Sequence, residues 1–238
     1  MSQLVVALDL PSGREALELV DRLGDEGSFY KVGLELYTRE GPGLVRALKG
    51  RGCSVFLDLK LHDIPHTVER AAAAAADLGV DLLTVHATGG STMLEAAVRG
   101  VRASGAGTRT LAVTLLTSLS AAEIEAVWGR TLDSIRDEVL RLAAAARAAG
   151  ADGVVASALE ARDLRRTLGA EALLVTPGIR LAGGEHHDQS RVATPAVAVE
   201  AGATHLVVGR PITGAADPRA ALLRVRSEIA SATPGSAR

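Results

Sequence analysis

The stretch 55-VFLDLKLHDIPHTVERAAAAAADLG-79 contains one complete strand-and-helix unit and indicates how the rest of the chain folds. Residues 55–59 form a short apolar run that is typical of a buried parallel strand. Charged side chains follow this run, and residues 67–78 then have the Ala-rich composition of a helix. Gly79 is expected to end the helix, because glycine readily takes the positive φ that a helix-to-strand turn needs.

Seven more apolar runs of strand length alternate with segments of helical composition. The strand-like runs cover residues 4–8, 29–32, 82–85, 111–115, 153–156, 173–175 and 206–208. The expected helices cover residues 13–23, 42–48, 91–102, 133–149, 159–168, 195–200 and 218–229. Strict alternation of this kind implies parallel strands joined by right-handed crossovers. Together with the quoted unit, the runs supply the eight strands that a closed (β/α)8 barrel requires.

An open, doubly wound sheet is the alternative α/β architecture. The strand count and the polar residues at the strand ends favour the closed barrel. The 238 residues suit one such barrel, and no linker or break in composition marks a second domain. We therefore expect a single (β/α)8 domain over residues 1–230, followed by a flexible tail over residues 231–238.

The composition argues against several classes of partner. Hydrophobic residues make up 47% of the chain and aromatic residues 2%, so the core must be aliphatic and few rings are available to stack on bases. The formal net charge is −2, so no global basic field attracts nucleic acid or an anionic membrane. Any recognition of phosphate must therefore be local.

No targeting or membrane-spanning segment is recognisable in the sequence. No basic segment precedes a long apolar stretch, and no apolar run reaches membrane-spanning length. Cys53 is the one cysteine, so there is no intrachain disulfide framework. These features fit a cytoplasmic protein.

Charged and polar side chains stand at the ends of many expected strands. The active groups of parallel barrels gather at the carboxyl ends of the strands and in the loops that follow. Here those positions hold Asp9, Lys31, Asp58, Lys60, Asp63, His86, Thr117, Ser118, Arg180 and Arg210. Burial of so many polar groups without partners is costly, so their concentration at one end of the barrel predicts a site.

Asp58 and Lys60 are two residues apart, so their side chains project to the same side of their strand. A charged pair at a strand end is most often a solvated rim rather than a functional site. The presence of Asp9 and Lys31 on neighbouring strands favours function, because four alternating charges can then interleave as Lys31, Asp58, Lys60 and a further Asp. Such a network stabilises the ammonium form of a lysine.

The loops after the last two strands predict a phosphate site. Barrels often hold phosphate with the loops after strands seven and eight. Gly178 permits close approach of the backbone, and Gly209-Arg210 supplies an amide and a guanidinium. The alternative for Gly209-Arg210-Pro211 is an ordinary turn with a surface arginine.

Residues 180–191 form a long connection that contains Gly183-Gly184. We interpret it as a lid that closes over the ligand and excludes water, with a disordered surface loop as the alternative. The run Glu185-His186-His187-Asp188 suggests metal ligands, but adjacent histidines on one loop rarely complete a site. We therefore expect no metal, and we interpret His86 as a packing residue rather than a base.

The quoted stretch resembles the signature of the orotidine 5'-phosphate decarboxylase family. Asp58-Leu59-Lys60-Leu61-His62-Asp63-Ile64-Pro65-His66-Thr67 matches that family's pattern Asp-x-Lys-x-x-Asp-Ile-Pro-x-Thr at every fixed position. Further matches are Val6-Ala7-Leu8-Asp9, Tyr30-Lys31-Val32-Gly33, Thr114-Leu115-Leu116-Thr117-Ser118, Val175-Thr176-Pro177-Gly178-Ile179-Arg180, Asp188-Gln189 and Val208-Gly209-Arg210-Pro211. The resemblance covers nearly the whole chain, and the tail after Ile229 lies outside it.

The resemblance implies a TIM-barrel lyase without cofactor that converts orotidine 5'-phosphate to uridine 5'-phosphate, the last step of UMP synthesis. It implies that Lys60 is the proton donor to C6 of the pyrimidine. Asp58 then lies beside the substrate carboxylate. Lys31 and Asp9 hold the ribose hydroxyls and complete the charge network.

The same resemblance implies a homodimer in which Asp63 and Thr67 reach into the site of the partner subunit. Ile64, between them, belongs to the substrate-binding set. The resemblance places Thr117 and Ser118 near the pyrimidine, with Thr117 the better candidate for direct contact. The remaining substrate-binding residues are Pro177 at the ring and Arg180, Gln189, Gly209 and Arg210 at the phosphate.

Two other functions remain open. The Asp-x-Lys-x-x-Asp core also occurs in magnesium-dependent sugar-phosphate decarboxylases or aldolases of the same superfamily, whereas Ile64-Pro65-x-Thr67 and Gln189 favour the nucleotide enzyme. The other alternative is a non-catalytic barrel that senses nucleotide phosphates. The intact charge set argues against a sensor, because a binding module has no need for a buried ammonium beside carboxylates.

Overall fold

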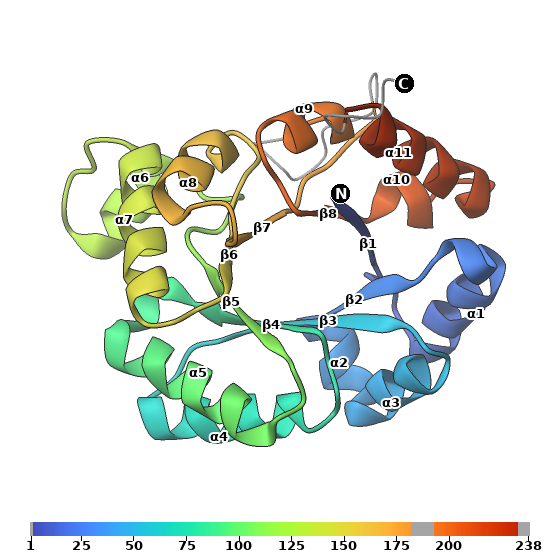
Figure 1. The fold of residues 1–238 in the computed structure, drawn as a ribbon, viewed down its shortest axis with the longest axis horizontal. Coiled ribbons are helices and arrows are strands. Elements are labelled where there is room, and N and C mark those ends of the chain that lie inside the picture. The colour runs from blue at the N-terminus through green and yellow to red at the C-terminus, as the bar shows by residue number, and fades with distance from the viewer. Residues whose placement is uncertain (1, 182–192, 233–238) are drawn as a thin grey trace.

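The computed structural model describes residues 2–181 and 193–232, and these form a closed barrel of eight parallel strands. The strands pair in chain order, and β8 pairs with β1 to close the ring. Their bounds are β1 Gln3–Ala7, β2 Phe29–Gly33, β3 Ser54–Leu61, β4 Leu82–His86, β5 Arg109–Val113, β6 Gly153–Val155, β7 Leu173–Thr176 and β8 His205–Val208. Helices surround this ring on its outside (Figure 1). The predicted (β/α)8 TIM barrel is therefore confirmed.

The helices follow the strands largely as the sequence predicts. Their bounds are α1 Gly13–Leu23, α2 Leu34–Glu40, α3 Pro42–Gly50, α4 Pro65–Ala76, α5 Ser91–Ser104, α6 Ala121–Trp128, α7 Ile135–Ala148, α8 Ala161–Leu168, α9 Pro195–Glu200, α10 Arg210–Thr213 and α11 Pro218–Ala232. Short 3-10 turns cover Gly24–Glu26 and Ala87–Gly89. Helices α2, α6 and α10 are additions to the sequence-based prediction.

The three additional helices differ in how visible they are from sequence. Helix α6 has a readable signal, because Ser120 and Glu123 form a capping box. Helix α2 starts directly after β2 with Gly33 as its N-cap and no side-chain cap, so no local signal marks its start. Helix α10 is four residues long and has Pro211 in its first turn, which the sequence analysis interpreted as a turn alone.

The core has two layers, one inside the barrel and one between the strands and the helices. The inner layer consists of Val5, Ala7, Phe29, Phe56, Leu82, Leu111, Val113, Val155, Val175 and Val207. The outer layer is larger and is built mainly from Leu, Val and Ala. The core is therefore aliphatic apart from a few rings, as the composition predicts.

Polar side chains brace the amino end of the barrel. Asp81 accepts a hydrogen bond from the N–H of Val55 at 2.7 Å and forms an ion pair with Lys49 at 2.9 Å. Asp152 likewise accepts from the N–H of Thr110 at 2.8 Å. These carboxylates align neighbouring strands, so this end of the barrel contributes stability.

Strand β3 is longer than the predicted run of residues 55–59 and contains a bulge. Leu57 pairs with Leu83 but Leu61 pairs with Val85, so β3 advances by four residues while β4 advances by two. Within this bulge Lys60 has a φ of 51°, the one positive φ of a non-glycine among the described residues. A left-handed backbone at such a residue costs about 1–3 kcal/mol and is found most often at functional sites.

The end of the chain departs slightly from expectation. Helix α11 continues through Ala232, past the predicted end at residue 229. The rest of the expected tail, residues 233–238, lies outside the described residues. Within the part of the chain that the structure describes, no helix is long and apolar enough to cross a membrane.

Candidate active site

A cavity of about 500 Å³ opens at the carboxyl ends of the strands. Four of the predicted charged residues line it together: Asp9, Lys31, Asp58 and Lys60. Asp9 follows β1, Lys31 lies on β2, and Asp58 and Lys60 lie on β3. These three neighbouring strands therefore bring the charges to one wall of the cavity, as the strand-end positions predict.

The four charges form a continuous chain of ion pairs. The Nζ atom of Lys31 lies 2.9 Å from Oδ1 of Asp9 and 3.7 Å from Oδ2 of Asp58. The Nζ atom of Lys60 lies 2.8 Å from the same Oδ2 of Asp58. The side chains of Lys31 and Asp58 are each 11% exposed, whereas that of Lys60 is 35% exposed and accessible from the cavity. The expected order Lys31, Asp58, Lys60 is present, and Asp9 continues the chain beyond Lys31.

Gly33 leaves the space that the first ion pair needs. A Cβ atom at this position would lie 3.0 Å from Nζ of Lys31 and 3.4 Å from Oδ1 of Asp9. Any larger residue would therefore displace the lysine ammonium by a few tenths of an ångström. The sequence analysis quoted Gly33 as part of a motif but gave it no role. The need for a glycine here arises from the side chains of Lys31 and Asp9, which only the fold brings next to it.

Six further predicted residues line the same cavity from other directions. They are Thr117, Ser118, Pro177, Arg180, Gly209 and Arg210. Thr117 and Ser118 follow β5, and the others lie in the connections after β7 and β8. Two arginines and the Asp/Lys network thus line the same cavity. Gln189, and nearly all of the connection interpreted as a lid, lie outside the described residues.

Three residues that the sequence analysis assigned to the site do not line this cavity. Asp63 and Ile64 lie in the loop after β3, and Thr67 lies in the first turn of α4. All three are exposed, and Ile64 has 66% of its surface accessible. Among the described residues Asp63 forms no ion pair, and its carboxylate accepts the N–H of Ile64 at 2.6 Å.

A second opening of about 130 Å³ gives access to the same charges from another side. It shares Asp9, Lys31, Asp58 and Lys60 with the main cavity, and Leu34 at the start of α2 borders it. Leu34 is itself 61% exposed. The charge network is therefore accessible from a surface that carries an uncovered apolar side chain.

Two histidines near the network, His62 and His86, contact each other. The rings of His62 and His86 lie with their centroids 5.4 Å apart. Burial lowers the pKa of His86 below its ordinary value, and the nearby His62 and Lys60 lower it further. A neutral, half-buried His86 agrees with the interpretation of this residue as a packing group. The run of residues 185–188, considered as metal ligands, lies outside the described residues, and the described ones contain no cluster of three or more potential ligands.

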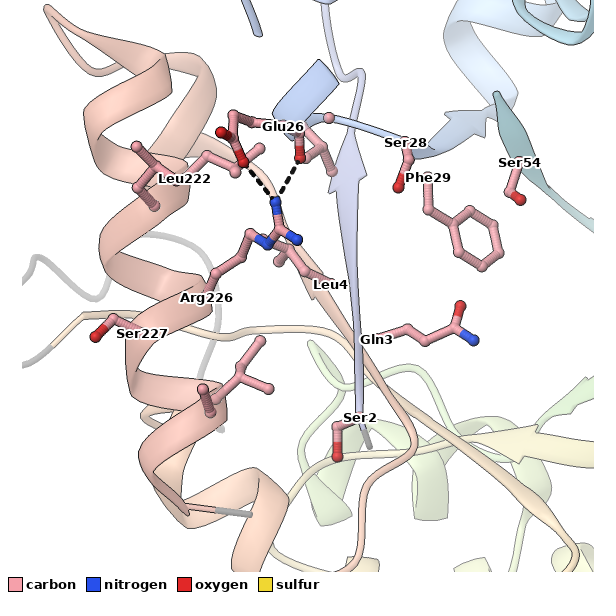
Figure 2. Close-up of a pocket in the computed structure, with 15 residues that line it drawn as sticks. Ser2, Gln3, Leu4, Glu26, Ser28, Phe29, Ser54, Leu222, Arg226 and Ser227 are labelled. Carbon is pink, nitrogen blue, oxygen red and sulfur yellow. Dashed lines mark hydrogen bonds and ion pairs between the residues drawn. The ribbon is translucent and has the colours of Figure 1, made fainter. Parts of the chain in front are cut away.

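The opposite end of the barrel has a cavity of about 580 Å³, and the charged residues that line it are Glu26 and Arg226. Arg226 donates to the Glu26 carboxylate at 2.7 Å and to the Glu26 carbonyl at 3.2 Å (Figure 2). Arg219 adds a second contact to the same carboxylate at 3.7 Å. This is an exposed ion-pair cluster that joins α11 to the turn before β2. Active groups of parallel barrels gather at the carboxyl ends of the strands, so the cavity at that end is the candidate site.

Comparison with known proteins identifies the family of the chain. Residues 2–225 match the model of the orotidine 5'-phosphate decarboxylase / HUMPS family. A curated relative from Halorhodospira halophila named orotidine 5'-phosphate decarboxylase is 53% identical over 230 residues, 97% of each chain. One of the same name from Nitrosococcus oceani is 48% identical and covers 97% of this chain and 98% of its own.

A solved structure gives the same result at the level of the fold. The crystal structure of orotidine 5'-phosphate decarboxylase from Lactobacillus acidophilus has a TM-score of 0.85 and 40% sequence identity. The match covers 96% of this chain and 99% of that one. The chain therefore belongs to the orotidine 5'-phosphate decarboxylase / HUMPS family of enzymes.

Proposed function

We propose that the protein decarboxylates orotidine 5'-phosphate to uridine 5'-phosphate without a metal or an organic cofactor, and that Lys60 is the proton donor. The observation that carries this proposal is the position of the Lys60 ammonium, 2.8 Å from Asp58 in a cavity that two arginines also line. The network of alternating charges holds that ammonium in one place. Its accessible side faces the space where a substrate can bind.

The chemistry of the reaction requires a fixed cation at one carbon. When the bond between C6 and the carboxylate breaks, carbon dioxide leaves and the electron pair stays on C6 as a vinylic carbanion. No adjacent carbonyl accepts these electrons, so the site must supply electrostatic stabilisation of about 20 kcal/mol, near the upper end of enzyme catalysis. The Lys60 ammonium stabilises the developing charge and then transfers its proton to C6.

The remaining residues of the cavity bind the rest of the nucleotide. Asp58 lies beside the substrate carboxylate, and Asp9 and Lys31 bind the ribose hydroxyls. The pyrimidine is contacted by Thr117, Ser118 and Pro177, and the phosphate by Arg180, Gln189, Gly209 and Arg210. Phosphate binding far from C6 contributes energy that orders the site for the chemical step.

Turnover of orotidine 5'-phosphate in the presence of EDTA tests this function directly. We expect the ultraviolet absorbance of the substrate to decrease at the same rate before and after EDTA treatment, because a lysine supplies the charge that a metal otherwise provides. A magnesium-dependent sugar-phosphate enzyme of the same superfamily would lose its activity in EDTA and would not convert orotidine 5'-phosphate. A sensor would bind the nucleotide without consuming it.

We further propose that the active unit is a homodimer with shared sites, in which Asp63 and Thr67 act in the partner subunit and Ile64 is one of the substrate-binding residues. Ile64 and Leu34 are large apolar side chains that are mostly exposed in the single chain. The second opening beside Leu34 offers a route by which a partner's carboxylate can reach Lys60. Two-fold symmetry then builds two equivalent sites at one interface.

Co-expression of two inactive variants tests the shared site. Lys60→Ala and Asp63→Asn are each expected to be inactive as homodimers. In a mixed dimer one site combines the intact Lys60 of one subunit with the intact Asp63 of the other. Random pairing therefore restores about one quarter of the wild-type activity.

The matched control mixes the single variants Lys60→Ala and Asp58→Asn. Both residues lie on β3 of their own chain. Because both residues then serve the site of their own chain, mixing these variants leaves every site defective. Recovery in the first mixture and none in the second is the expected result. Equal rates in both mixtures would show that Asp63 acts within its own chain.

A further inference from the structure

Thr84 on β4 lies beside the bulge of β3 and is fully buried. Its hydroxyl accepts a hydrogen bond from the backbone N–H of Lys60 at 2.9 Å and donates one to Oδ1 of Asp58 at 2.9 Å. The Thr84 hydroxyl oxygen thus links the backbone of Lys60 to the carboxylate of Asp58. Thr84 is not among the described residues that line the cavity, so it acts on a substrate through these two neighbours.

The first effect of this hydroxyl is to fix the rotation of the Asp58 carboxylate. Because Oδ1 is held by Thr84, Oδ2 is turned toward the two ammonium groups. It lies 2.8 Å from Nζ of Lys60 and 3.7 Å from Nζ of Lys31. A carboxylate whose two oxygens have separate donors has one orientation, and hydrogen bonds to a charged acceptor are the stronger kind.

The second effect is on the backbone that carries the lysine. The bulge removes Lys60 from the regular ladder between β3 and β4, and its φ of 51° is a strained conformation for a residue with a Cβ. The Thr84 hydroxyl gives the Lys60 N–H the acceptor that the ladder no longer supplies. The strained conformation therefore persists because a side chain from the next strand satisfies it.

We propose that Thr84 is a positioning residue for the decarboxylation. Its hydroxyl fixes the Lys60 backbone relative to the Asp58 carboxylate, and this holds the Lys60 ammonium at one position in the cavity. The inference rests on the proposed function for its kinetic readout. Its structural content, the dependence of the Asp58–Lys60 contact on one hydroxyl, is independent of the substrate.

Two substitutions separate the hydroxyl from the shape of the side chain. Thr84→Val keeps the branched shape and removes both hydrogen bonds, whereas Thr84→Ser keeps the hydroxyl. We expect Thr84→Val to lower kcat about 100-fold, because a misplaced catalytic group costs on that order, with KM for orotidine 5'-phosphate within about twofold of wild type. Thr84→Ser is expected to recover kcat to within about threefold.

Thr108→Val is the matched control for loss of a buried threonine hydroxyl. Thr108 is buried next to the start of β5, and its hydroxyl donates to the Val80 carbonyl at 2.6 Å at the amino end of the barrel. We expect this variant to lose as much thermal stability as Thr84→Val while keeping the wild-type kcat. A similar decrease of kcat in both variants would mean that destabilisation alone is measured, and it would overturn the proposal.

Crystal structures of the two Thr84 variants keep the inference separate from the proposed function. The contact between Asp58 Oδ2 and Lys60 Nζ, 2.8 Å here, is expected to be lost in Thr84→Val and retained in Thr84→Ser. An unchanged contact in Thr84→Val, or a normal kcat in that variant, contradicts a positioning role. A wild-type protein that leaves orotidine 5'-phosphate unchanged would instead contradict the proposed function. The crystal structures of the two Thr84 variants would still test the positioning role of Thr84.

Discussion

Replacing Lys60 with alanine is expected to lower kcat for orotidine 5'-phosphate by at least about 10⁴-fold, equivalent to about 5.5 kcal/mol of transition-state stabilisation. The substitution removes both the cation that faces the carbanion and the proton that completes the product. The fold should remain, because the Lys60 side chain is 35% exposed and leaves no closed cavity. Asp58 also keeps contacts with Lys31 and Thr84. Steady-state kinetics and a thermal unfolding curve measure the two effects separately.

Lys49→Ala is the control for the loss of a lysine from an ion pair. Lys49 lies 2.9 Å from Asp81 and is 31% exposed, values close to those of Lys60, but it belongs to the amino end of the barrel. We expect this variant to keep the wild-type kcat with a slightly lower melting temperature. A near-normal rate in Lys60→Ala would refute the proton-donor role whatever the control shows.

The barrel was predictable because its signals are local. Each strand is a short apolar run, and each helix has a periodic or Ala-rich segment that glycine often ends, so alternation and strand count follow from the sequence. The bulge in β3 was not predictable in this way. Within the bulge the Lys60 N–H donates to the hydroxyl of Thr84 in the next strand, and no property of residues 55–61 alone indicates that the strand continues past Lys60.

The charged half of the site was predictable for a related reason. Parallel strands of a barrel place their carboxyl ends together, so Asp9, Lys31, Asp58 and Lys60 had to lie near one another once the fold was known. The alternation of Lys31, Asp58 and Lys60 followed from the sequence, whereas the pairing of Asp9 with Lys31 needed the structure. Thr84 was missed because a threonine inside an apolar strand is usually a core residue, and its polar character within residues 82–85 was the one available signal.

The roles of Asp63 and Thr67 have a different status. Their place in the proposed function came from the family resemblance, and the single chain leaves both exposed and away from the main cavity. Geometry within one subunit cannot predict a contact that another subunit makes. The mixed-dimer experiment therefore tests a part of the site that neither the sequence pattern nor the fold determines.

Replacing Arg210 with alanine is expected to raise KM for orotidine 5'-phosphate about 100-fold, or about 2.7 kcal/mol, the scale of a charge-assisted contact to phosphate. Arg210 begins α10 and lines the cavity, and the proposed function assigns it to the phosphate rather than to C6, so the substitution should affect binding more than the chemical step. Arg219→Ala, which removes an exposed arginine from the Glu26 cluster at the amino end, is the matched control and should leave KM unchanged.

Orotidine without its phosphate identifies the group that Arg210 binds. The wild-type enzyme should process this nucleoside far less efficiently than the nucleotide, because the phosphate contacts are gone for every variant. Arg210→Ala should then have the same kcat/KM for orotidine as the wild type, within about twofold, since the phosphate that the guanidinium is proposed to contact is absent. If the variant instead loses as much activity toward orotidine as toward the nucleotide, Arg210 supports the cavity itself, and the phosphate must be held by other residues.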